Sequence, residues 1–416
     1  MTFIDTVVIG AGHAGLAVSR QLAEAGRDHV VLERGGVAER WRSERWDSLH
    51  LLTPRWMARL PGWRYRGPDP EGFMPVSELI GHLEGYAASF TAPVRTETTV
   101  LRVTVQDPGY QVVTDQGTWR SRHVVVATGP WGRPHVPDSV SAAPSQLHVT
   151  TASRYRNPAG LPDGGVLVVG ASSSGVQIAD ELARSGREVI LSVGGHTRMP
   201  RRYRGMDIFW WLEQTGRLAR TIDDVGDPYA ARREPSMQLV GRAHGKDENL
   251  DLGVLADRGV RLTGRLTALA GMTAGFADDL GESVAEAEAR MHRFLDAVDE
   301  HVDRTGLSPE VWEPQRPDPV PAVATPSRLD LAREGVSTVL LATGYRPHHP
   351  WLEVPVSAPD GHIRQYRGVT PAAGLYVVGQ RFQHRRDSGF IDGARHDAAA
   401  VVAHLTSDPS LDPSLR

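Results

Sequence analysis

The stretch VLVVGASSSG, residues 166–175, decides the fold, because it reads as a buried strand that turns into a helix through a glycine-rich corner. The same pattern occurs near the start of the chain in TVVIGAGHAG, residues 6–15. There the sequence predicts a strand over Thr6–Ile9, a helix over Ala14–Ala25 and a second strand over Asp28–Leu32. Two strand–helix–strand units in one chain predict two Rossmann-like domains of the doubly wound α/β class.

The first glycine-rich turn has the residues that a bound diphosphate requires. Gly10 permits the tight turn, Gly12 lets a diphosphate approach the backbone, and Gly15 lets the helix pack closely on the strand. His13 and Ala14 stand where the helix begins, and the free N–H groups and dipole of a helix N-terminus favour negative charge. We therefore expect these five residues to contact a dinucleotide.

The second turn repeats this pattern with one substitution. The sequence predicts a strand over Gly165–Val169, a helix over Val176–Arg184 and a strand over Glu188–Leu191. Serine replaces the middle glycine of the turn, so hydroxyl donors lie beside the helix N-terminus. The phosphate-binding residues expected in this unit are Gly170, Ser172, Ser173, Ser174 and Gly175.

The residues that follow the second strand of each unit differ in charge. Glu33 is placed to accept hydrogen bonds from a ribose diol. Ser192 has the corresponding place in the second unit, and Arg198 and Arg201 follow it. A carboxylate would repel a 2′-phosphate, whereas arginine binds phosphate through two hydrogen bonds, so the second site is expected to prefer NADPH over NADH. The alternative is that these arginines form a solvated loop.

The composition excludes several classes of function. The chain has 416 residues and a net charge of -4, with 46 basic and 50 acidic residues mixed along it, so neither nucleic acid nor an anionic membrane is an expected partner. No secretion signal or membrane-spanning run is recognised, and a cytoplasmic location is expected. Cysteine is absent, and the histidines lack metal-ligand spacing, so neither thiol chemistry nor a metal site is expected.

Two further strands flank the second unit and end in the same tripeptide. VVVATGPWGRP covers Val124–Pro134 and VLLATGYRP covers Val339–Pro347. After the second of these come GLYVVG, over Gly374–Gly379, and a helical segment that begins SGFIDGARHD. The arrangement resembles the linkers of flavoproteins with two dinucleotide-binding domains, which implies that the second nucleotide unit is inserted into the first.

These features resemble the NADPH-dependent flavoprotein monooxygenases, in particular the branch of the indole-pyruvate and dimethylaniline monooxygenases. The resemblance extends over nearly the whole chain. The stretch Glu33–Gly62 is similar to a segment of that group that has an acid, a glycine pair, a tryptophan and a Leu-x-Leu run before a proline.

The resemblance implies FAD in the first domain and NADPH in the second. Glu33 and Arg34 would hold the adenosine of FAD, Arg40 and Trp41 would line the diphosphate and the flavin, and Leu51 to Thr53 would pass close to the flavin ring. The other residues expected at the cofactors are Val100, Ala127, Thr128, Gly129, Ala342, Thr343, Gly344, Gly379, Gly389 and Ile391.

Two positions depart from the pattern of that group. Its F-x-G-x-x-x-H motif would fall on residues 142–148, where only His148 is retained. Pro54 stands where drug-metabolising members carry asparagine, which favours the indole-pyruvate branch or weaker oxygen chemistry.

The expected domain organisation has three parts. Residues 1–155 and 335–416 would form the FAD domain, and residues 156–334 the NADPH domain. Within the latter, residues of about 206–312 have clustered aromatics and a long helical pattern, which predicts a helical cover over the active site or a subunit interface in a homodimer.

The reaction implied by the resemblance is oxygen transfer. NADPH would reduce the flavin, and a C4a-(hydro)peroxyflavin formed with O2 would transfer one oxygen atom to a small organic substrate. The sequence does not identify a catalytic side chain. An alternative is a flavin-dependent NAD(P)H:acceptor oxidoreductase that passes electrons to ferredoxin or quinone without oxygen insertion.

Overall fold

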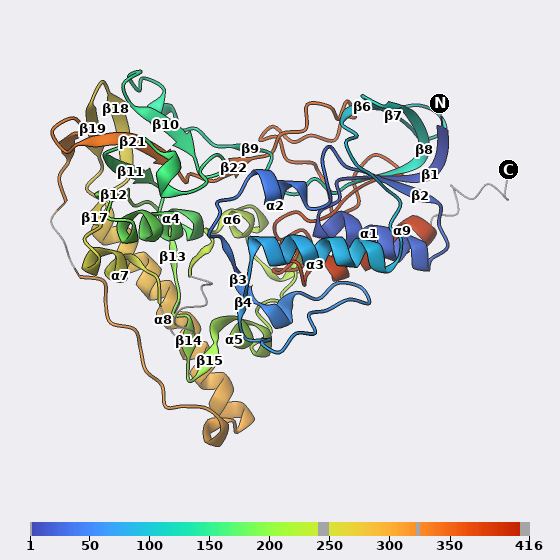
Figure 1. Ribbon diagram of the computed structural model, residues 1–416. Helices are drawn as coiled ribbons and strands as arrows, with labels where there is room; N and C mark the ends of the chain where they lie inside the picture. The colour runs from blue at the N-terminus through green and yellow to red at the C-terminus, as the bar shows by residue number, and fades with distance from the viewer. Residues whose placement is uncertain (1, 240–248, 322–324, 408–416) are drawn as a thin grey trace.

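The computed structural model describes residues 2–239, 249–321 and 325–407. Figure 1 shows two lobes side by side, each with a β-sheet and helices against it. The first lobe contains the start and the end of the described chain, and the second contains the middle. This arrangement confirms the predicted fold class, in which one nucleotide unit is inserted into the other.

The sheet of the first lobe has its parallel centre at the first glycine-rich turn. Strand β1 pairs in parallel with β2 on one side and β8 on the other, and β23 joins β8 from the C-terminal part of the chain. The strands of this sheet are β5 (Val94–Arg95), β2 (His29–Leu32), β1 (Thr2–Ile9), β8 (Gly117–Val126), β7 (Tyr110–Thr114), β6 (Val100–Val105) and β23 (Leu375–Val377).

The strands of this sheet present apolar side chains to both faces, and helices cover one of the two faces. Val8, Val31 and Val125 pack in one cluster with apolar residues of α1, α3 and α9, whereas Val7 and Val124 pack in a cluster on the opposite face. The helices of this lobe are α1 (His13–Glu24), α2 (Glu39–Ser43), α3 (Val76–Ser89) and α9 (Ala394–Ser407).

The second lobe repeats this plan around β11. Strand β11 pairs in parallel with β12 and β21, so the apolar run at residues 165–169 lies buried at the centre of a five-stranded sheet. Its strands are β10 (His148–Thr151), β21 (Val336–Leu341), β11 (Gly165–Val169), β12 (Val189–Ser192) and β17 (Arg261–Thr263), and its helices are α4 (Ser173–Arg184) and α7 (Leu252–Asp257).

The observed strand pairing differs from both expected domain boundaries. The expectation assigned residues 148–151 and 336–341 to the FAD domain, yet β10 and β21 pair with each other and β21 pairs with β11 in the second sheet. The second sheet therefore includes residues 148–151 and 336–341. The reason is that β21 supplies the neighbour that β11 requires on its far side, as β8 does for β1.

Short elements connect the lobes and extend the second one. The three-stranded sheet β18 (Leu266–Ala270), β19 (Thr273–Phe276) and β20 (Arg328–Asp330) packs through its apolar residues on the second lobe's sheet. Four two-stranded pairs complete the strands of the described residues: β3 (His50–Pro54) with β4 (Phe73–Pro75), β9 (Arg133–Pro134) with β22 (Tyr345–Arg346), β13 (Thr197–Arg198) with β16 (Met237–Gln238), and β14 (Arg202–Tyr203) with β15 (Met206–Asp207).

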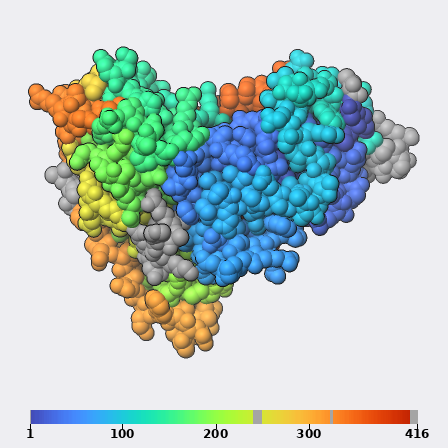
Figure 2. All heavy atoms as spheres, viewed as in Figure 1, coloured from blue at the N-terminus to red at the C-terminus, as the bar shows by residue number. Residues whose placement is uncertain are grey.

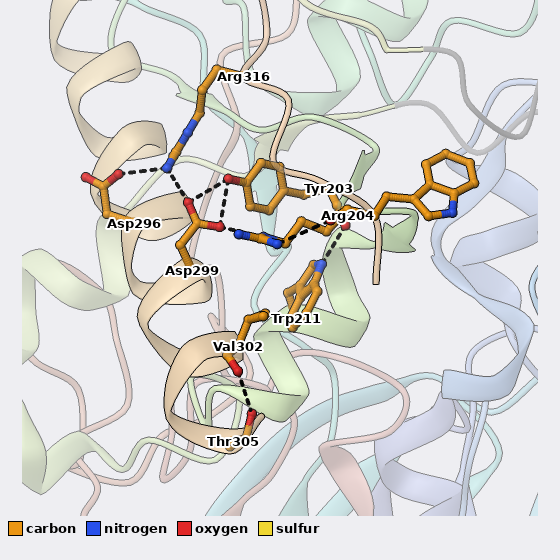
Figure 3. Close-up of polar contacts among 9 residues, drawn as sticks. Tyr203, Arg204, Trp211, Asp296, Asp299, Val302, Thr305 and Arg316 are labelled. Atoms are coloured by element: carbon orange, nitrogen blue, oxygen red, sulfur yellow. Dashed lines mark hydrogen bonds and ion pairs between the residues drawn. The ribbon is translucent and has the colours of Figure 1, made fainter. Parts of the chain in front are cut away.

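The expected cover region forms a projection built on one long helix. Helix α8 (Leu280–Thr305) runs away from the second sheet, and α5 (Ile208–Gln214) lies beside it in Figure 1, with α6 (Pro228–Arg233) nearer the junction of the lobes. Asp299 of α8 accepts hydrogen bonds from the Tyr203 hydroxyl at 2.8 Å and from Nε of Arg204 at 2.7 Å, and it also pairs with Arg316 (Figure 3). The carboxylate of Asp299 thus joins the β14–β15 hairpin and the returning loop to α8.

Within the described residues, no helix is both long enough and apolar enough to cross a membrane.

Candidate functional site

Two adjoining cavities connect the glycine-rich turns. A cavity of about 920 Å³ is lined by residues of both lobes, including the turn at Gly170, and a cavity of about 330 Å³ is lined by the turn at Gly10. His13, Trp41, Trp131 and Gly389 line both. Figure 2 shows the outer surface notched between the two lobes. A molecule bound in the smaller cavity would therefore meet one bound in the larger.

The backbone of the first turn requires glycine at two positions. Gly10 has φ +106°, and a Cβ added there would lie 2.8 Å from the carbonyl oxygen of Ala127. A Cβ on Gly15 would lie 1.9 Å from the carbonyl oxygen of Gly10. Gly12 differs, because no protein atom lies within 4 Å of its added Cβ and the residue lines the smaller cavity. The three glycines thus have the geometry that the sequence predicts.

Glu33 stands at the end of β2 and lines the smaller cavity. Its Oε2 accepts a hydrogen bond of 2.7 Å from the backbone N–H of Ala11. Burial raises the pKa of Glu33, and the hydrogen bonds from the N–H groups of Ala11 and Gly35 oppose that change. Backbone N–H groups of Ala11 and Gly35 therefore fix the orientation of this carboxyl group in the lining of the smaller cavity.

Four buried polar atoms of the smaller cavity's lining have no hydrogen-bond partner among the described residues. They are Nε2 of His13, Nη1 of Arg40, Oγ1 of Thr128 and Nδ1 of His349. Burial lowers the pKa of His13 to about 4, so its imidazole is neutral at pH 7. Burial also lowers the pKa of Arg40, and Glu44 opposes this. Because buried polar atoms are normally paired, these atoms fit a polar ligand such as a diphosphate.

Most of the residues expected at FAD lie together at these cavities. Trp41 lines both cavities, and the Arg45 guanidinium lies 5.2 Å from its ring centroid. The smaller cavity is lined by Gly10, Gly12, His13, Ala14, Glu33, Arg34, Arg40, Val100, Ala127, Thr128, Gly129, Gly379 and Gly389, and the larger by Leu51, Thr53 and Ile391.

The second turn has the same backbone geometry as the first. Gly170 has φ +105°, and its added Cβ would lie 2.6 Å from the carbonyl oxygen of Ala342. A Cβ on Gly175 would lie 1.8 Å from the carbonyl oxygen of Gly170. The Ser172 hydroxyl donates to the carbonyl oxygen of Ser236 at 2.9 Å, so it also fixes a neighbouring segment. The larger cavity is lined here by Gly170, Ser172, Ser173, Ser174, Ala342, Thr343 and Gly344.

The expectation that Arg198 and Arg201 bind a 2′-phosphate does not match their positions. Arg198 is 4% exposed and pairs with Asp251 at 2.7 Å and with Glu288 at 2.8 Å. Arg201 is 1% exposed and pairs with Asp207 at 2.7 Å. Neither residue is part of the cavity lining. The physical reason is that buried charges need partners, and these two arginines hold their own segments to neighbouring elements.

Ser192 is also directed away from the cavity. Its hydroxyl donates to the carbonyl oxygen of Gly264 at 3.1 Å and accepts from the N–H of Leu266 at 2.8 Å. The residue is 2% exposed. Ser192 therefore ties the end of β12 to the following strands and has no hydroxyl donor left for a ribose.

Two arginines that the sequence did not indicate line the larger cavity. Arg290 and Arg293 stand on α8, and the Arg290 guanidinium donates to the carbonyl oxygen of His196 at 2.8 Å, just beyond β12. Gly194, Gly195 and Thr197 line the cavity beside them. Because α8 is about ninety residues further along the chain, only its packing against the segment after β12 identifies these arginines.

A second group of arginines in the lining of the larger cavity comes from other segments of the chain. Arg217 comes from the segment after α5, and Arg381 and Arg386 come from the segment after β23. Glu234 lies among them and pairs with Arg386 at 2.6 Å. The sequence analysis assigned no role to any of these four residues, because their proximity arises only from the folding of distant segments.

The chain is similar in sequence or in structure to several known flavin enzymes and oxidoreductases. A family model described as pyridine nucleotide-disulphide oxidoreductase matches residues 7–205. A Geobacillus kaustophilus protein described as an uncharacterized CzcO-like oxidoreductase is 30% identical over 404 residues, which cover 96% of this chain and 97% of that protein. Rice indole-3-pyruvate monooxygenase YUCCA4 is 29% identical over 440 residues, covering 96% of this chain and 87% of the relative.

A solved structure shares the whole arrangement of the two lobes. The flavin-containing monooxygenase of Stenotrophomonas maltophilia superposes with a TM-score of 0.66 and covers 98% of this chain and 99% of its own. The sequence identity is 19%, so the likeness concerns the fold.

Proposed function

Since the chain belongs to the family of CzcO-like oxidoreductases, we propose that it is an FAD-dependent, NADPH-consuming monooxygenase that transfers one atom of O2 to a small organic substrate. The observation that carries the proposal is the meeting of two cavities, each built on its own glycine-rich turn, at His13, Trp41 and Gly389. Two dinucleotides held in this way would bring a nicotinamide to a flavin. The named relatives that are monooxygenases support the same reaction class.

The smaller cavity has the features that FAD needs. Glu33 would bind the ribose of the adenosine, and the helix N-terminus at His13 would face the diphosphate together with Arg40. When bound, the flavin supplies hydride acceptance and reaction with O2, which protein side chains cannot perform. The chain's own contribution is to hold the cofactor and to exclude water.

The larger cavity has the features that NADPH needs on the second lobe. The backbone N–H groups at the start of α4 would face its diphosphate. We assign the 2′-phosphate to Arg290 and Arg293, in place of Arg198 and Arg201. Arginine suits phosphate because its planar group donates two parallel hydrogen bonds.

The absence of cysteine distinguishes this chain from disulphide reductases that use redox-active thiols. The sequence contains no cysteine at all, whereas disulphide reduction by such two-domain flavoproteins uses a pair of redox thiols. The matching family description therefore identifies the architecture, and the reaction must use another acceptor. Oxygen transfer is consistent with that requirement.

An isotope experiment tests the proposed reaction. Purified protein loaded with FAD would be supplied with NADPH and ¹⁸O2, with thioanisole as a nucleophilic probe and phenylacetone as a carbonyl probe. We expect ¹⁸O in the sulfoxide or the ester, formed in proportion to the NADPH consumed. If NADPH is converted only into hydrogen peroxide with every probe, and ferredoxin or a quinone accelerates its oxidation, the chain is the NAD(P)H:acceptor oxidoreductase instead.

The cytoplasmic location and the homodimer stay predictions. Sedimentation of the FAD-loaded protein distinguishes a monomer from a dimer.

A further inference from the structure

We propose that Arg201 is a positioning residue for the flavin, because from the second lobe it fixes the shape of residues 51–53, which line the larger cavity. The inference rests on the proposed function, since residues 51–53 are the run expected beside the flavin ring. Three observations carry it: an irregularity in strand β3, a hydrogen bond from Arg201 to that irregularity, and the contacts that hold Arg201 itself.

Strand β3 contains extra residues at the point where it passes the larger cavity. His50 pairs with Pro75 and Pro54 pairs with Phe73, so three residues of β3 lie opposite one residue of β4. A bulge of this kind interrupts the ladder of hydrogen bonds and directs side chains to new positions. The three residues, 51–53, all line the larger cavity. The shape of the bulge therefore decides which groups a molecule in the cavity would meet.

Arg201 reaches the middle of this bulge from a segment 149 residues further along the chain than Leu52. Its Nη1 donates a hydrogen bond of 2.9 Å to the carbonyl oxygen of Leu52. Such a bond is significant in a bulge, because backbone groups there lose ladder partners and need others. The guanidinium also lies 4.7 Å from the ring centroid of Phe73, which stands on β4. Arg201 thus contacts both strands of the pair that contains the bulge.

The start of α5 fixes Arg201 on its own side. Nη2 pairs with Asp207 at 2.7 Å, and the same carboxylate accepts a hydrogen bond of 2.8 Å from the backbone N–H of Phe209. The guanidinium lies 5.6 Å from the ring centroid of Phe209. Burial lowers the pKa of Arg201, and Asp207 opposes this change. Because an arginine donates through a rigid planar fork, its partners Asp207 and Leu52 are held at a set separation.

Arg198 offers a contrast within the same segment of the chain. It is also buried, and it also binds carboxylates and a main-chain carbonyl oxygen. Its partners are Asp251, Glu288 and the carbonyl oxygen of Asp318, all in the part of the chain that forms the second lobe. Burial and ion pairing alone therefore do not connect an arginine with the cavity. The hydrogen bond to Leu52 makes that connection for Arg201.

Amide hydrogen exchange tests the contact in the purified protein, with and without added FAD. Arg201→Lys retains a cation for Asp207 but lacks the second arm of the guanidinium that reaches Leu52. We expect peptides that contain residues 51–53 to exchange about tenfold faster than in the wild type. Arg198→Lys is the matched control, and it should leave the exchange of these peptides unchanged. Wild-type exchange in Arg201→Lys, or equal acceleration in both variants, would overturn the proposal.

The flavin then shows whether the contact matters to the cofactor. In FAD-loaded Arg201→Lys, the visible absorption bands of the flavin should shift, and anaerobic flavin reduction at saturating NADPH should slow by about tenfold. The dissociation constant of NADPH should stay close to the wild-type value, because the change concerns the geometry of the flavin and leaves the NADPH site intact. A weaker affinity for NADPH with an unchanged maximal rate of reduction would contradict the positioning role. So would the same loss of rate in Arg198→Lys.

A second variant keeps the test possible if Arg201→Lys does not fold. Asp207→Asn retains an acceptor for the N–H of Phe209 but removes the charge that holds Arg201. It should accelerate the exchange of residues 51–53 by a smaller factor than Arg201→Lys. Unchanged exchange of this segment in Asp207→Asn would count against the proposal.

Failure of this proposal can be told apart from failure of the oxygen chemistry. The exchange of residues 51–53 needs no cofactor, and anaerobic reduction by NADPH needs no oxygen. If both respond to Arg201→Lys as expected but no ¹⁸O reaches any probe, the proposed reaction alone is contradicted. If ¹⁸O is transferred but residues 51–53 exchange alike in Arg201→Lys and the wild type, only the role of Arg201 is contradicted.

Discussion

The two glycine-rich turns have nearly the same backbone and different surroundings. An added Cβ would meet the carbonyl oxygen of Ala127 at 2.8 Å from Gly10, and that of Ala342 at 2.6 Å from Gly170. The strand ends differ: Glu33 presents a carboxylate to its cavity, whereas the Ser192 hydroxyl is used by neighbouring backbone groups. The shared backbone suits each turn to a diphosphate, and we propose that residues outside the turn decide which dinucleotide binds.

The largest expected difference is between two glycines of the first turn. Gly15→Val should prevent stable folding of the first lobe, because even a Cβ would lie 1.9 Å from the Gly10 carbonyl oxygen. Overpacking of this kind costs about 3 kcal/mol or more. Gly12→Ala meets no protein atom within 4 Å and should leave the unfolding midpoint almost unchanged while FAD is lost. Urea unfolding of the apoproteins and flavin content measure the two effects, and equal loss of stability in both variants would contradict the assignment.

Substitutions of Arg198 and of Arg293 should have different effects, the first on the stability of the protein and the second on cofactor binding. Arg198→Gln leaves Asp251 and Glu288 without their buried partner, which should destabilise the protein by about 3 kcal/mol. Arg293→Gln should leave stability unchanged, because Arg293 is exposed to the cavity. Thermal unfolding of both variants gives the comparison. A stable Arg198→Gln protein that has lost only its preference for NADPH would restore the role expected from the sequence.

The substitution Glu33→Gln tests the role of the carboxylate at the end of β2. The substitution preserves shape but removes the charge that would bind the ribose, so the affinity for FAD should fall by about 2 kcal/mol, or roughly thirtyfold. Fluorescence titration of the apoprotein with FAD measures the affinity. Unchanged affinity for FAD would show that Glu33 serves only the hydrogen bond from Ala11.

Arg293→Gln should also change the choice of nicotinamide cofactor. Loss of one arginine from a phosphate site should lower the affinity for NADPH by about tenfold and that for NADH by much less. The ratio of the two dissociation constants is the quantity to compare with wild type. A ratio that stays constant would remove Arg293 from the 2′-phosphate site.

A further expected effect is a dependence of stability on pH that arises from His13 of the first turn. The pKa of His13 is lowered from 6.5 to about 4 by burial, so the unfolded chain takes up a proton before the folded one does. Stability from this residue is present above pH 6.5 and is lost as the pH falls toward 4. His13→Gln should therefore show a weaker loss of stability between pH 6.5 and pH 4. An unchanged profile in urea unfolding would contradict this origin.

The local elements could be predicted because each is determined by a few neighbouring residues. The strand expected over Gly165–Val169 is observed with those bounds, and α1 begins one residue before the expected helix. The apolar run and the glycine spacing carry this information in the sequence itself. The same holds for Glu33, whose place is set by the strand that precedes it.

The remaining features depend on contacts between distant segments. Strand β21 belongs to the second sheet because it pairs with β11, about 170 residues earlier, and no local pattern distinguishes that pairing from the alternative. Arg198 resembles a phosphate ligand in the sequence, and only the approach of Asp251 and Glu288 shows that its charge is already paired. Arg217 lines the larger cavity only because the segment after β23 folds against the segment after α5.

The most direct test of the central claim is to reduce the FAD-loaded protein with NADPH without oxygen, admit O2 rapidly, and follow the flavin absorbance together with the peroxide released. If the two turns hold two dinucleotides that cooperate in oxygen transfer, NADPH should bleach the flavin faster than NADH, and oxidised flavin should return only after a delay in the presence of NADP⁺. Immediate return of oxidised flavin with one equivalent of peroxide, unaffected by NADP⁺, would contradict the monooxygenase and favour electron transfer to another acceptor.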